Sequence, residues 1–341
     1  MKYDLEYRVK AGDAGMTVRG VLRSRLGVSR RLMSKIANAP DGDALSGGVF
    51  IGGLPARFID RVREGDGVAL LYPDEASDFI PQDIAIDVLY EDDDFLALNK
   101  QAGFVVHPTK GHADGTIANG LMKRMRDRGE RYKIRFANRL DMDTSGVLLV
   151  AKNAHAQNWF AAQSDAGRAK KFYLAVLDGA PAADSGVIEA PIILEADGSP
   201  RRVVRDDGAL SRTFYRILER YDYGERGAAF ALISISSGRT HQIRVHMAHI
   251  GCPVMGDTLY GSDAVERRSR SDEGVAERQG GCEDANPPLI ARQALHAALL
   301  RFARPGGREE TTVCAKPPLD LTSCLSALRS KAVQPSPMRV I

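Results

Sequence analysis

The chain carries, at residues 138–153, the stretch Asn-Arg-Leu-Asp-Met-Asp-Thr-Ser-Gly-Val-Leu-Leu-Val-Ala-Lys-Asn. Its second half, residues 147–151, is a short apolar run beside turn residues, which predicts a buried strand. Asp141 then lies on the tight loop that leads into this strand. A rigid strand beside the loop would hold the carboxylate in a fixed place, as a nucleophile or a catalytic base requires. The alternative is a loop aspartate that caps a turn through its own backbone.

A second segment gathers polar side chains that can take part in chemistry. Residues 237–246 hold two arginines, two histidines and a glutamine. They directly follow residues 231–235, whose alternating pattern predicts a strand. So many polar groups at the end of a strand are not typical of a plain solvated surface.

Together the two segments resemble the RluA-type family of pseudouridine synthases, which isomerise uridine in ribosomal or transfer RNA. The family pattern around the catalytic aspartate, His-Arg-Leu-Asp-x-x-Thr-Ser-Gly, corresponds to residues 138–146, and the later motif Gly-Arg-x-His-Gln-Ile-Arg corresponds to residues 238–244. Further matches follow in the family's order at residues 98–108, 171–176, 256–261 and 292–297. Several motifs in the right order are far more specific than any single one.

Two positions depart from the family pattern. Asn138 stands where the family has histidine, and Gln101 stands where the early motif has proline. Neither position is the nucleophile, so we expect both changes to leave activity in place. The sequence leaves open how Asn138 affects the hydrogen bonding near Asp141.

The resemblance implies the roles of three catalytic residues. Asp141 would be the nucleophile, and Arg239 would be the ion-pair partner that keeps it ionised and oriented. Attack on the sugar and attack on the base are both compatible with these residues. Tyr173 would pack against the target base and assist proton transfer. The alternatives are a structural salt bridge for Arg239 and a core tyrosine with a tethered hydroxyl for Tyr173.

The implied reaction breaks a carbon–nitrogen bond, turns the base and rejoins it through carbon, which calls for no cofactor, metal or nucleotide. The sequence agrees, because it has no Walker loop, no dinucleotide glycine fingerprint and no metal-ligand spacing. We interpret the motif histidines His107, His241 and His296 as structural hydrogen-bonding groups.

The target uridine must be flipped out of folded RNA while basic side chains hold the flanking backbone. Arg139, Arg244 and the basic residues between positions 123 and 135 are the candidates in this part of the chain. The net charge is only +3, but the charges are unevenly distributed. Residues 14–40 hold six bases and no acid, residues 73–94 hold nine acids and no base, and residues 121–139 hold eight bases and two acids. Such blocks favour a backbone-binding surface more than the mean charge does.

Residues 1–74 are predicted to form a small α+β domain. Helical spacing runs over residues 16–26, a second helix opens with Ser29 as its N-cap, and residues 49–55 and 65–72 have the pattern of short strands. Two helices followed by a hairpin resemble an S4-type RNA-binding domain. Arg30, Arg31 and Lys35 would then contact phosphates. The alternative for these three is a solvated helix face.

Residues 75–83 form an acidic linker, and residues 84–330 form the catalytic domain. Strands are predicted at 84–90, 95–99, 171–177, 187–194, 211–218 and 228–236, and helices at 116–125, 155–164 and 241–250. The predicted fold class is α+β, with a mainly antiparallel mixed sheet flanked by helices and loops. Residues 262–286 are predicted to be a mobile surface loop, and residues 331–341 a C-terminal tail.

The composition is that of an ordinary globular protein. The 341 residues are 44% hydrophobic and 27% charged, with no apolar run long enough to span a membrane. The first residues lack the apolar core of a signal peptide, and the four cysteines are too widely spaced to suggest a zinc site or a disulfide framework. We therefore expect a cytoplasmic protein, and a monomer.

Three functions compete at this stage: an RNA pseudouridine synthase, a non-catalytic RNA-binding or ribosome-assembly protein on the same fold, and an unrelated hydrolase that uses Asp141 with His241. The ordered motifs favour the first. An S4-type domain ahead of the catalytic domain favours large-subunit (23S) ribosomal RNA as the substrate, with transfer RNA as the alternative.

Overall fold

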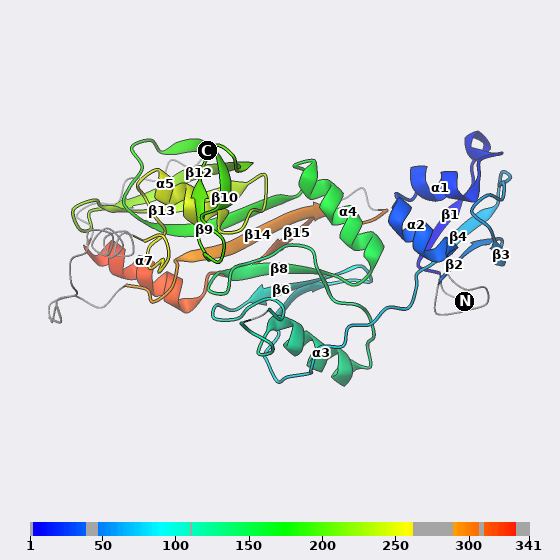
Figure 1. Ribbon diagram of the computed structural model, residues 1–341, viewed down its shortest axis with the longest axis horizontal. Coiled ribbons are helices and arrows are strands. Elements are labelled where there is room, and N and C mark those ends of the chain that lie inside the picture. The colour runs from blue at the N-terminus through cyan, green and yellow to red at the C-terminus, as the bar shows by residue number, and fades with distance from the viewer. Residues whose placement is uncertain (1–2, 39–46, 110, 262–288, 307–309, 332–341) are drawn as a thin grey trace.

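The computed structural model describes residues 3–38, 47–109, 111–261, 289–306 and 310–331. The predicted loop at 262–286 and the tail beyond residue 331 lie outside the described residues. The described chain is elongated, with a small N-terminal sheet at one end and a large sheet beyond it (Figure 1).

The N-terminal sheet is antiparallel, with the strand order β1-β4-β2-β3. Ser29 caps the second helix as predicted, because its hydroxyl accepts a hydrogen bond from the backbone N–H of Leu32 at 3.2 Å. Gly52 and Gly53 both have positive φ and split the single strand predicted at 49–55 into a hairpin. The elements are β1 (Leu5–Arg8), η1 (Ala11–Asp13), α1 (Val18–Ser24), α2 (Arg30–Ala37), β2 (Gly48–Ile51), β3 (Leu54–Ala56) and β4 (Gly67–Leu71).

The large sheet confirms the predicted α+β class with a mainly antiparallel mixed sheet. Its main path is β11-β10-β12-β13-β9-β14-β8-β6-β5, in which β8 and β14 are the parallel neighbours. Its strands are β5 (Val88–Glu91), β6 (Phe95–Lys100), β7 (Arg135–Phe136), β8 (Ser145–Ala151), β9 (Lys170–Asp178), β10 (Ser185–Leu194), β11 (Arg202–Val204), β12 (Ala209–Tyr221), β13 (Ala228–Ile235), β14 (Leu295–Ala303) and β15 (Glu310–Cys314). Its helices are α3 (Ile117–Arg128), α4 (Ala154–Asp165), α5 (Gln242–His249) and α7 (Leu319–Lys331).

The observed boundaries lie close to the predicted ones, with two main differences. The strand predicted to start at residue 84 begins at Val88, because Ile84 lies against Gly120 of α3 instead of pairing in the sheet. The second difference is at the C-terminal end, where β14, β15 and α7 were not predicted as elements. β14 nevertheless lies near the middle of the sheet, between β9 and β8.

The continuous apolar run of β8 is explained by burial on both faces of the sheet. Val147 and Leu149 pack in one apolar cluster with Phe160 of α4, whereas Leu148 and Val150 pack in another that includes residues of α3, α5 and α7. A strand covered on both faces needs apolar residues at every position. Among the described helices, none is long and apolar enough to cross a membrane.

Gly146 allows β8 to begin where it does. Its φ is +110°, and a Cβ at this position would lie 2.2 Å from the carbonyl oxygen of Ala297 on β14. A larger residue would push the parallel strands apart. The start of β8, and therefore the end of the loop that carries Asp141, is fixed by this close approach.

The N-terminal domain rests on α4 of the catalytic region (Figure 1). The amide of Asn158 donates to the Ser29 hydroxyl at 3.0 Å, and Gly27 lies so close to Trp159 that a Cβ would be 2.9 Å from its ring. On α2, Lys35 forms an ion pair with Glu75 at 2.8 Å. Lys35, predicted to contact phosphate, is therefore neutralised by the acidic linker in this structure.

Candidate active site

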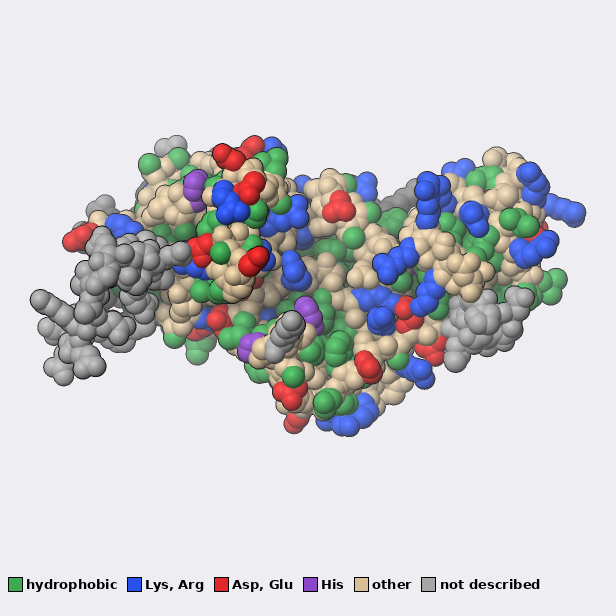
Figure 2. All heavy atoms as spheres, viewed as in Figure 1, with side chains coloured by type: hydrophobic (Ala, Val, Ile, Leu, Met, Phe, Trp, Pro, Cys, Tyr) green, Lys and Arg blue, Asp and Glu red, His purple; other side chains and the backbone are tan. Residues whose placement is uncertain are grey.

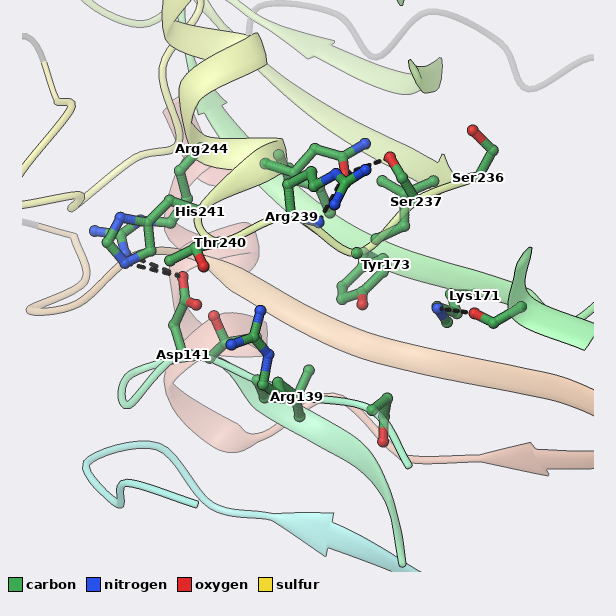
Figure 3. A pocket seen from close by; sticks show the side chains of 18 of the residues that line it. Arg139, Asp141, Lys171, Tyr173, Ser236, Ser237, Arg239, Thr240, His241 and Arg244 are labelled. Atoms are coloured by element: carbon green, nitrogen blue, oxygen red, sulfur yellow. Dashed lines mark hydrogen bonds and ion pairs between the residues drawn. The ribbon is translucent and has the colours of Figure 1, made fainter. Parts of the chain in front are cut away.

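Asp141 lines a pocket of about 700 Å³ between the loop before β8, the last turn of α4, β9 and the segment 235–244 (Figure 3). All three predicted catalytic residues, Asp141, Tyr173 and Arg239, line this pocket, and so do Arg139 and Arg244. The two sequence segments singled out above are therefore brought together across one cavity.

The loop that carries Asp141 is held from beneath by Lys100 of β6. The Lys100 ammonium, 1% exposed, donates to the carbonyl oxygens of Gln101, Met142 and Thr144 at 2.9, 2.7 and 3.0 Å. Burial lowers the pKa of Lys100 to about 7, against the opposing charges of Asp143 and Asp141. A single buried side chain thus ties the part of the loop that follows Asp141 to β6.

A second brace comes from the C-terminal part of the chain. The Arg292 guanidinium donates to the carbonyl oxygen of Asp143 at 2.9 Å and forms a bidentate pair with Asp320 of α7. The amide of Gln293 donates to the Thr144 hydroxyl at 3.3 Å. Residues about 150 positions downstream therefore help to set the position of the Asp141 loop.

Asn138, at the position where the family has histidine, is a hydrogen-bond partner of the β8 backbone. Its side-chain amide donates to the carbonyl oxygen of Val147 at 3.1 Å and accepts from the N–H of Leu149 at 2.7 Å. This pair of bonds mimics a strand partner and ties the residue three positions before Asp141 to the sheet. The hydrogen bonding left open by the sequence is thus satisfied without a histidine.

The carboxylate of Asp141 is paired with Arg244 of α5. The Nη1 atom of Arg244 lies 3.0 Å from Oδ2 of Asp141, and the same guanidinium makes a bidentate pair with Asp257 at 2.6 and 2.8 Å. The side chain of Arg244 is 5% exposed, Asp257 is fully buried, and Asp141 is 25% exposed. Desolvation opposes the charge of Arg244, but the hydrogen bonds and charges of Asp257 and Asp141 outweigh it and raise its pKa.

The ion pair predicted between Asp141 and Arg239 is formed by Arg244 in this structure. Arg244, predicted to bind RNA, is the ion-pair partner of Asp141, and Arg239, predicted to be that partner, is exposed. The backbone N–H of Arg239 donates to Oε1 of Gln242 at 3.1 Å, which fixes a turn ahead of α5. Arg244 lies inside α5 on its buried side, where it reaches Asp141.

His241 lies next to Asp141 in a strained conformation. Its φ is +57°, and it is the one non-glycine residue with positive φ in the described part of the chain. Its Nε2 atom is 4.0 Å from Oδ2 of Asp141, and Nδ1 is 2.9 Å from the Tyr260 hydroxyl. Burial lowers the pKa of His241, partly offset by the charge of Asp141, so the ring is neutral at pH 7. Strain of this kind is concentrated at functional sites.

Tyr173 of β9 is 6% exposed and lines the same pocket. In Figure 3 its ring lies between Asp141 and Lys171. Burial, together with the negative charge of Asp141, raises the pKa of its hydroxyl. The hydroxyl is therefore protonated throughout the neutral and mildly alkaline range.

The basic residues predicted to hold RNA differ in how far they are neutralised. Most of the block at 123–135 is paired with acids, and its partners include three carboxylates of the acidic block: Glu91 with Arg124, Asp74 with Arg131, and Glu75 with Arg135. By contrast, Arg139 is exposed at the pocket and Arg30 and Arg31 are exposed on α2, without ion-pair partners among the described residues. Figure 2 shows Lys and Arg side chains gathered on the N-terminal domain and near the centre of the same face.

Within the described residues, no group of three His, Cys, Asp or Glu side chains is arranged to hold a metal ion. The chemistry available to the pocket is that of a fixed carboxylate, its guanidinium partner, a buried tyrosine and a rim of free cations.

Comparison with known proteins identifies a family of RNA-modifying enzymes. Residues 94–249, which include Asp141 and Arg244, match the family model described as RNA pseudouridylate synthase. The chain is 38% identical over 290 residues to ribosomal large subunit pseudouridine synthase D of Xanthomonas campestris pv. campestris, covering 85% of this chain and 83% of that protein. It is 31% identical over 302 residues to the uncharacterized RNA pseudouridine synthase YjbO of Bacillus subtilis, covering 88% and 95%.

A solved structure shows the same fold. Human RNA pseudouridylate synthase domain containing 1 superposes with a TM-score of 0.52 at 26% identity, covering 74% of this chain and 97% of the human chain. With extended identity, a matching family model and a shared fold, this chain belongs to the RluA-type family of RNA pseudouridine synthases.

Proposed function

We propose that this RNA pseudouridine synthase modifies large-subunit ribosomal RNA, with Asp141 as the nucleophile and Arg244 as its ion-pair partner. The observation that carries the catalytic part is the 3.0 Å contact between Arg244 and one oxygen of Asp141 inside the pocket. The substrate part is supported by the relatives named as large-subunit enzymes, at 38% identity in two bacteria.

The pair prepares the carboxylate for attack. Arg244 is locked by Asp257, so its guanidinium cannot turn away when substrate enters. It engages Oδ2 of Asp141, whereas Oδ1 has no hydrogen-bond partner among the described residues. Oδ1 is thus the oxygen available to form a bond to the nucleotide.

The rest of the pocket suits a base that has left its helix. Flipping a nucleotide costs a few kcal/mol, which contacts to the base and the flanking backbone must offset. The ring of Tyr173 provides an apolar surface for the uracil, and the exposed Arg139 provides a cation at the rim. The isomerisation conserves the atoms of the nucleotide: the bond from N1 to the sugar is replaced by a bond from C5, and a proton leaves C5 while N1 gains one. We propose that no cofactor is needed.

The N-terminal domain would extend the RNA-binding surface. We propose an S4-type role for it, with Arg30 and Arg31 as phosphate contacts. Lys35 is left out of this set because Glu75 already neutralises it. We further propose that the enzyme acts as a cytoplasmic monomer.

Position-resolved pseudouridine mapping tests the proposal. Total RNA is compared between cells with and without this gene, and between deletion cells rescued by wild type or by Asp141→Ala. A large-subunit site that is lost on deletion and restored by wild type alone is the expected result. A lost site in transfer RNA would overturn the substrate class, and rescue by Asp141→Ala would overturn the nucleophile. Release of free uracil by the purified protein would indicate hydrolysis with His241 instead.

A further inference from the structure

Lys171 is a cation in the wall of the active-site pocket that the chemistry above does not use. It stands on β9, and its ammonium donates to the hydroxyl of Ser164, in the last turn of α4, at 2.7 Å. It also lies 5.9 Å from the centre of the Phe160 ring, on its face. These contacts hold the ammonium in one place while leaving N–H donors for another group.

The charge of Lys171 is poorly compensated. Among the described residues no carboxylate is in ion-pair contact with it, although Asp165, on the same pocket wall, acts on it at longer range. A partly buried cation without a counter-ion is unfavourable unless a ligand supplies the negative charge. Burial accordingly lowers the pKa of Lys171.

The ammonium is reachable from the pocket because a glycine faces it. A Cβ built at Gly238, on the opposite segment, would lie 3.8 Å from Nζ of Lys171, so a larger side chain there would cover the ammonium. The wall at this point therefore consists of a cation, a hydroxyl and a bare backbone, which is an arrangement suited to an anionic oxygen.

The spacing on β9 relates Lys171 to the target base. Residues two apart on a strand face the same side and lie about 6.5 Å apart along it. Lys171 and Tyr173 therefore both face the pocket, and both line it. A base packed on Tyr173 places its own or the next phosphate within reach of Lys171.

We propose that Lys171 and Ser164 form a subsite for one RNA phosphodiester beside the flipped uridine. The subsite fixes the backbone at the end of the pocket away from Asp141. It rests on the proposed function in taking RNA as the ligand and in packing the flipped base on Tyr173. Lys171 is a substrate-positioning residue in this proposal, because it touches the backbone and not the reacting atoms.

The test compares Lys171→Met with Lys171→Arg and with Lys170→Met. Lys170 is the matched control, since it is the neighbouring lysine on the other side of β9, and its ammonium bonds to the carbonyl oxygen of Gly167. The probe is an RNA fragment around a uridine that the wild type isomerises, measured by binding over a range of salt concentrations in the Asp141→Asn background.

Lys171→Met should weaken binding about tenfold and reduce the slope of log affinity against log salt by about 0.7–0.9. Lys171→Arg should restore most of both, and Lys170→Met should change neither. A purely structural role for Lys171 would alter thermal stability without this change in slope. An unchanged slope in a folded Lys171→Met protein overturns the proposal.

A second measurement needs no Lys171 variant that folds. Fragments with one neutral methylphosphonate linkage on either side of the target should reveal one linkage that wild type requires, with a loss of about tenfold. The wild-type result stands by itself; a folded Lys171→Met protein, used in addition, should be indifferent to that linkage, because the two changes remove the same contact. If wild type tolerates a neutral linkage on both sides, the subsite does not exist.

The two proposals can fail separately. If the wild type isomerises no uridine of large-subunit RNA, the proposed substrate is wrong. The Lys171 comparison then uses whichever RNA the mapping identifies.

Discussion

The two sides of the active-site pocket differ in whether their basic side chains have carboxylate partners. On the paired side, Arg244 is 5% exposed and contacts the carboxylates of Asp141 and Asp257. On the unpaired side, Arg139, Lys171 and Arg239 line the same pocket without ion-pair partners among the described residues. The difference separates a cation that the protein needs for its own geometry from cations left free for an anionic substrate.

This contrast follows from where each arginine lies on the chain. Arg239 and Arg244 belong to one short motif, yet the backbone turns between them at His241, whose left-handed conformation begins α5. The turn sends Arg239 to the surface and Arg244 into the interior. Burying a guanidinium is tolerable only with paired carboxylates, which Asp257 and Asp141 supply.

The largest effect is expected from replacing Asp141, the carboxylate that Arg244 holds in the pocket. Asp141→Asn should lower kcat on the order of 10⁴-fold or more, because the amide cannot act as the nucleophile. RNA binding should change less than threefold, about 0.6 kcal/mol. Single-turnover formation of pseudouridine measures this, with Asp143→Asn, on the same loop, as the control. Retained activity in Asp141→Asn would remove the basis of the proposed mechanism.

The second prediction sets the two arginines against each other. Arg244→Gln should lower kcat by about 10²–10³-fold and cost about 3–5 kcal/mol of stability, since it leaves Asp257 buried without a cation. Arg239→Gln should leave stability unchanged within about 0.5 kcal/mol and act mainly on KM. Steady-state kinetics and denaturant unfolding of both variants provide the measurement. A larger kcat loss for Arg239→Gln would reverse the assignment of the two sides.

The pairing of Asp141 with Arg244 instead of Arg239 shows what the sequence could and could not predict. The motifs that contain Asp141, Tyr173 and both arginines meet around one pocket, because each motif lies on or beside a strand whose apolar pattern is clear. Which arginine faces Asp141 depends on the backbone angle of His241 and on Asp257, thirteen residues beyond Arg244. Neither feature has a local pattern that distinguishes two arginines five residues apart.

The charge blocks show a similar limit. The uneven distribution favoured a backbone-binding surface, but several bases of the block at 123–135 form ion pairs with carboxylates of the acidic block, such as Glu91 and Glu75. Ion pairs between blocks that are distant in sequence depend on the fold, so they cannot be predicted from charge counts along the chain. The role of Lys100 could not be predicted for the same reason. Its ammonium bonds to the carbonyl oxygen of its neighbour and to two carbonyl oxygens more than 40 residues away.

The third prediction tests Lys100, which holds the Asp141 loop on the paired side of the pocket. Lys100→Met should lower the free energy of unfolding by about 2–4 kcal/mol, because buried carbonyls lose their donors. Activity should fall about tenfold as the Asp141 loop loosens. Because folding lowers the pKa of Lys100 from 10.5 to about 7, the unfolded chain binds more protons between these values. Stability of wild type relative to Lys100→Met should therefore increase as pH rises from 7 to 10. Denaturant unfolding across this range measures the difference, and a pH-independent difference would contradict it.

The fourth prediction tests whether unpaired cations of the N-terminal domain also bind RNA. Deleting residues 1–74 should leave the catalytic region folded and weaken RNA binding by about 10–100-fold, with a smaller salt slope. Arg30→Gln with Arg31→Gln in the full chain should reproduce part of this loss without exposing Trp159 of α4, which Gly27 now contacts. Binding isotherms at several salt concentrations compare the two. Equal affinity and an unchanged site profile for the deletion would exclude the domain from RNA recognition.

The smallest effect is expected from removing only the hydroxyl of Tyr173, which lies between the two sides. Its pKa is raised by burial and by the charge of Asp141, so its hydroxyl keeps its proton up to at least its ordinary pKa near 10. Wild-type activity should therefore show no alkaline loss from this group between pH 7 and 9.5. Tyr173→Phe should keep kcat within about tenfold, and Tyr173→Leu should lose about 10²-fold, if the ring acts as a surface for the base. A pH–rate profile for wild type and both variants distinguishes the ring from the hydroxyl. If Phe were as damaging as Leu, proton transfer by the hydroxyl would be the role of Tyr173, and the pocket would contain a second reacting group beside Asp141.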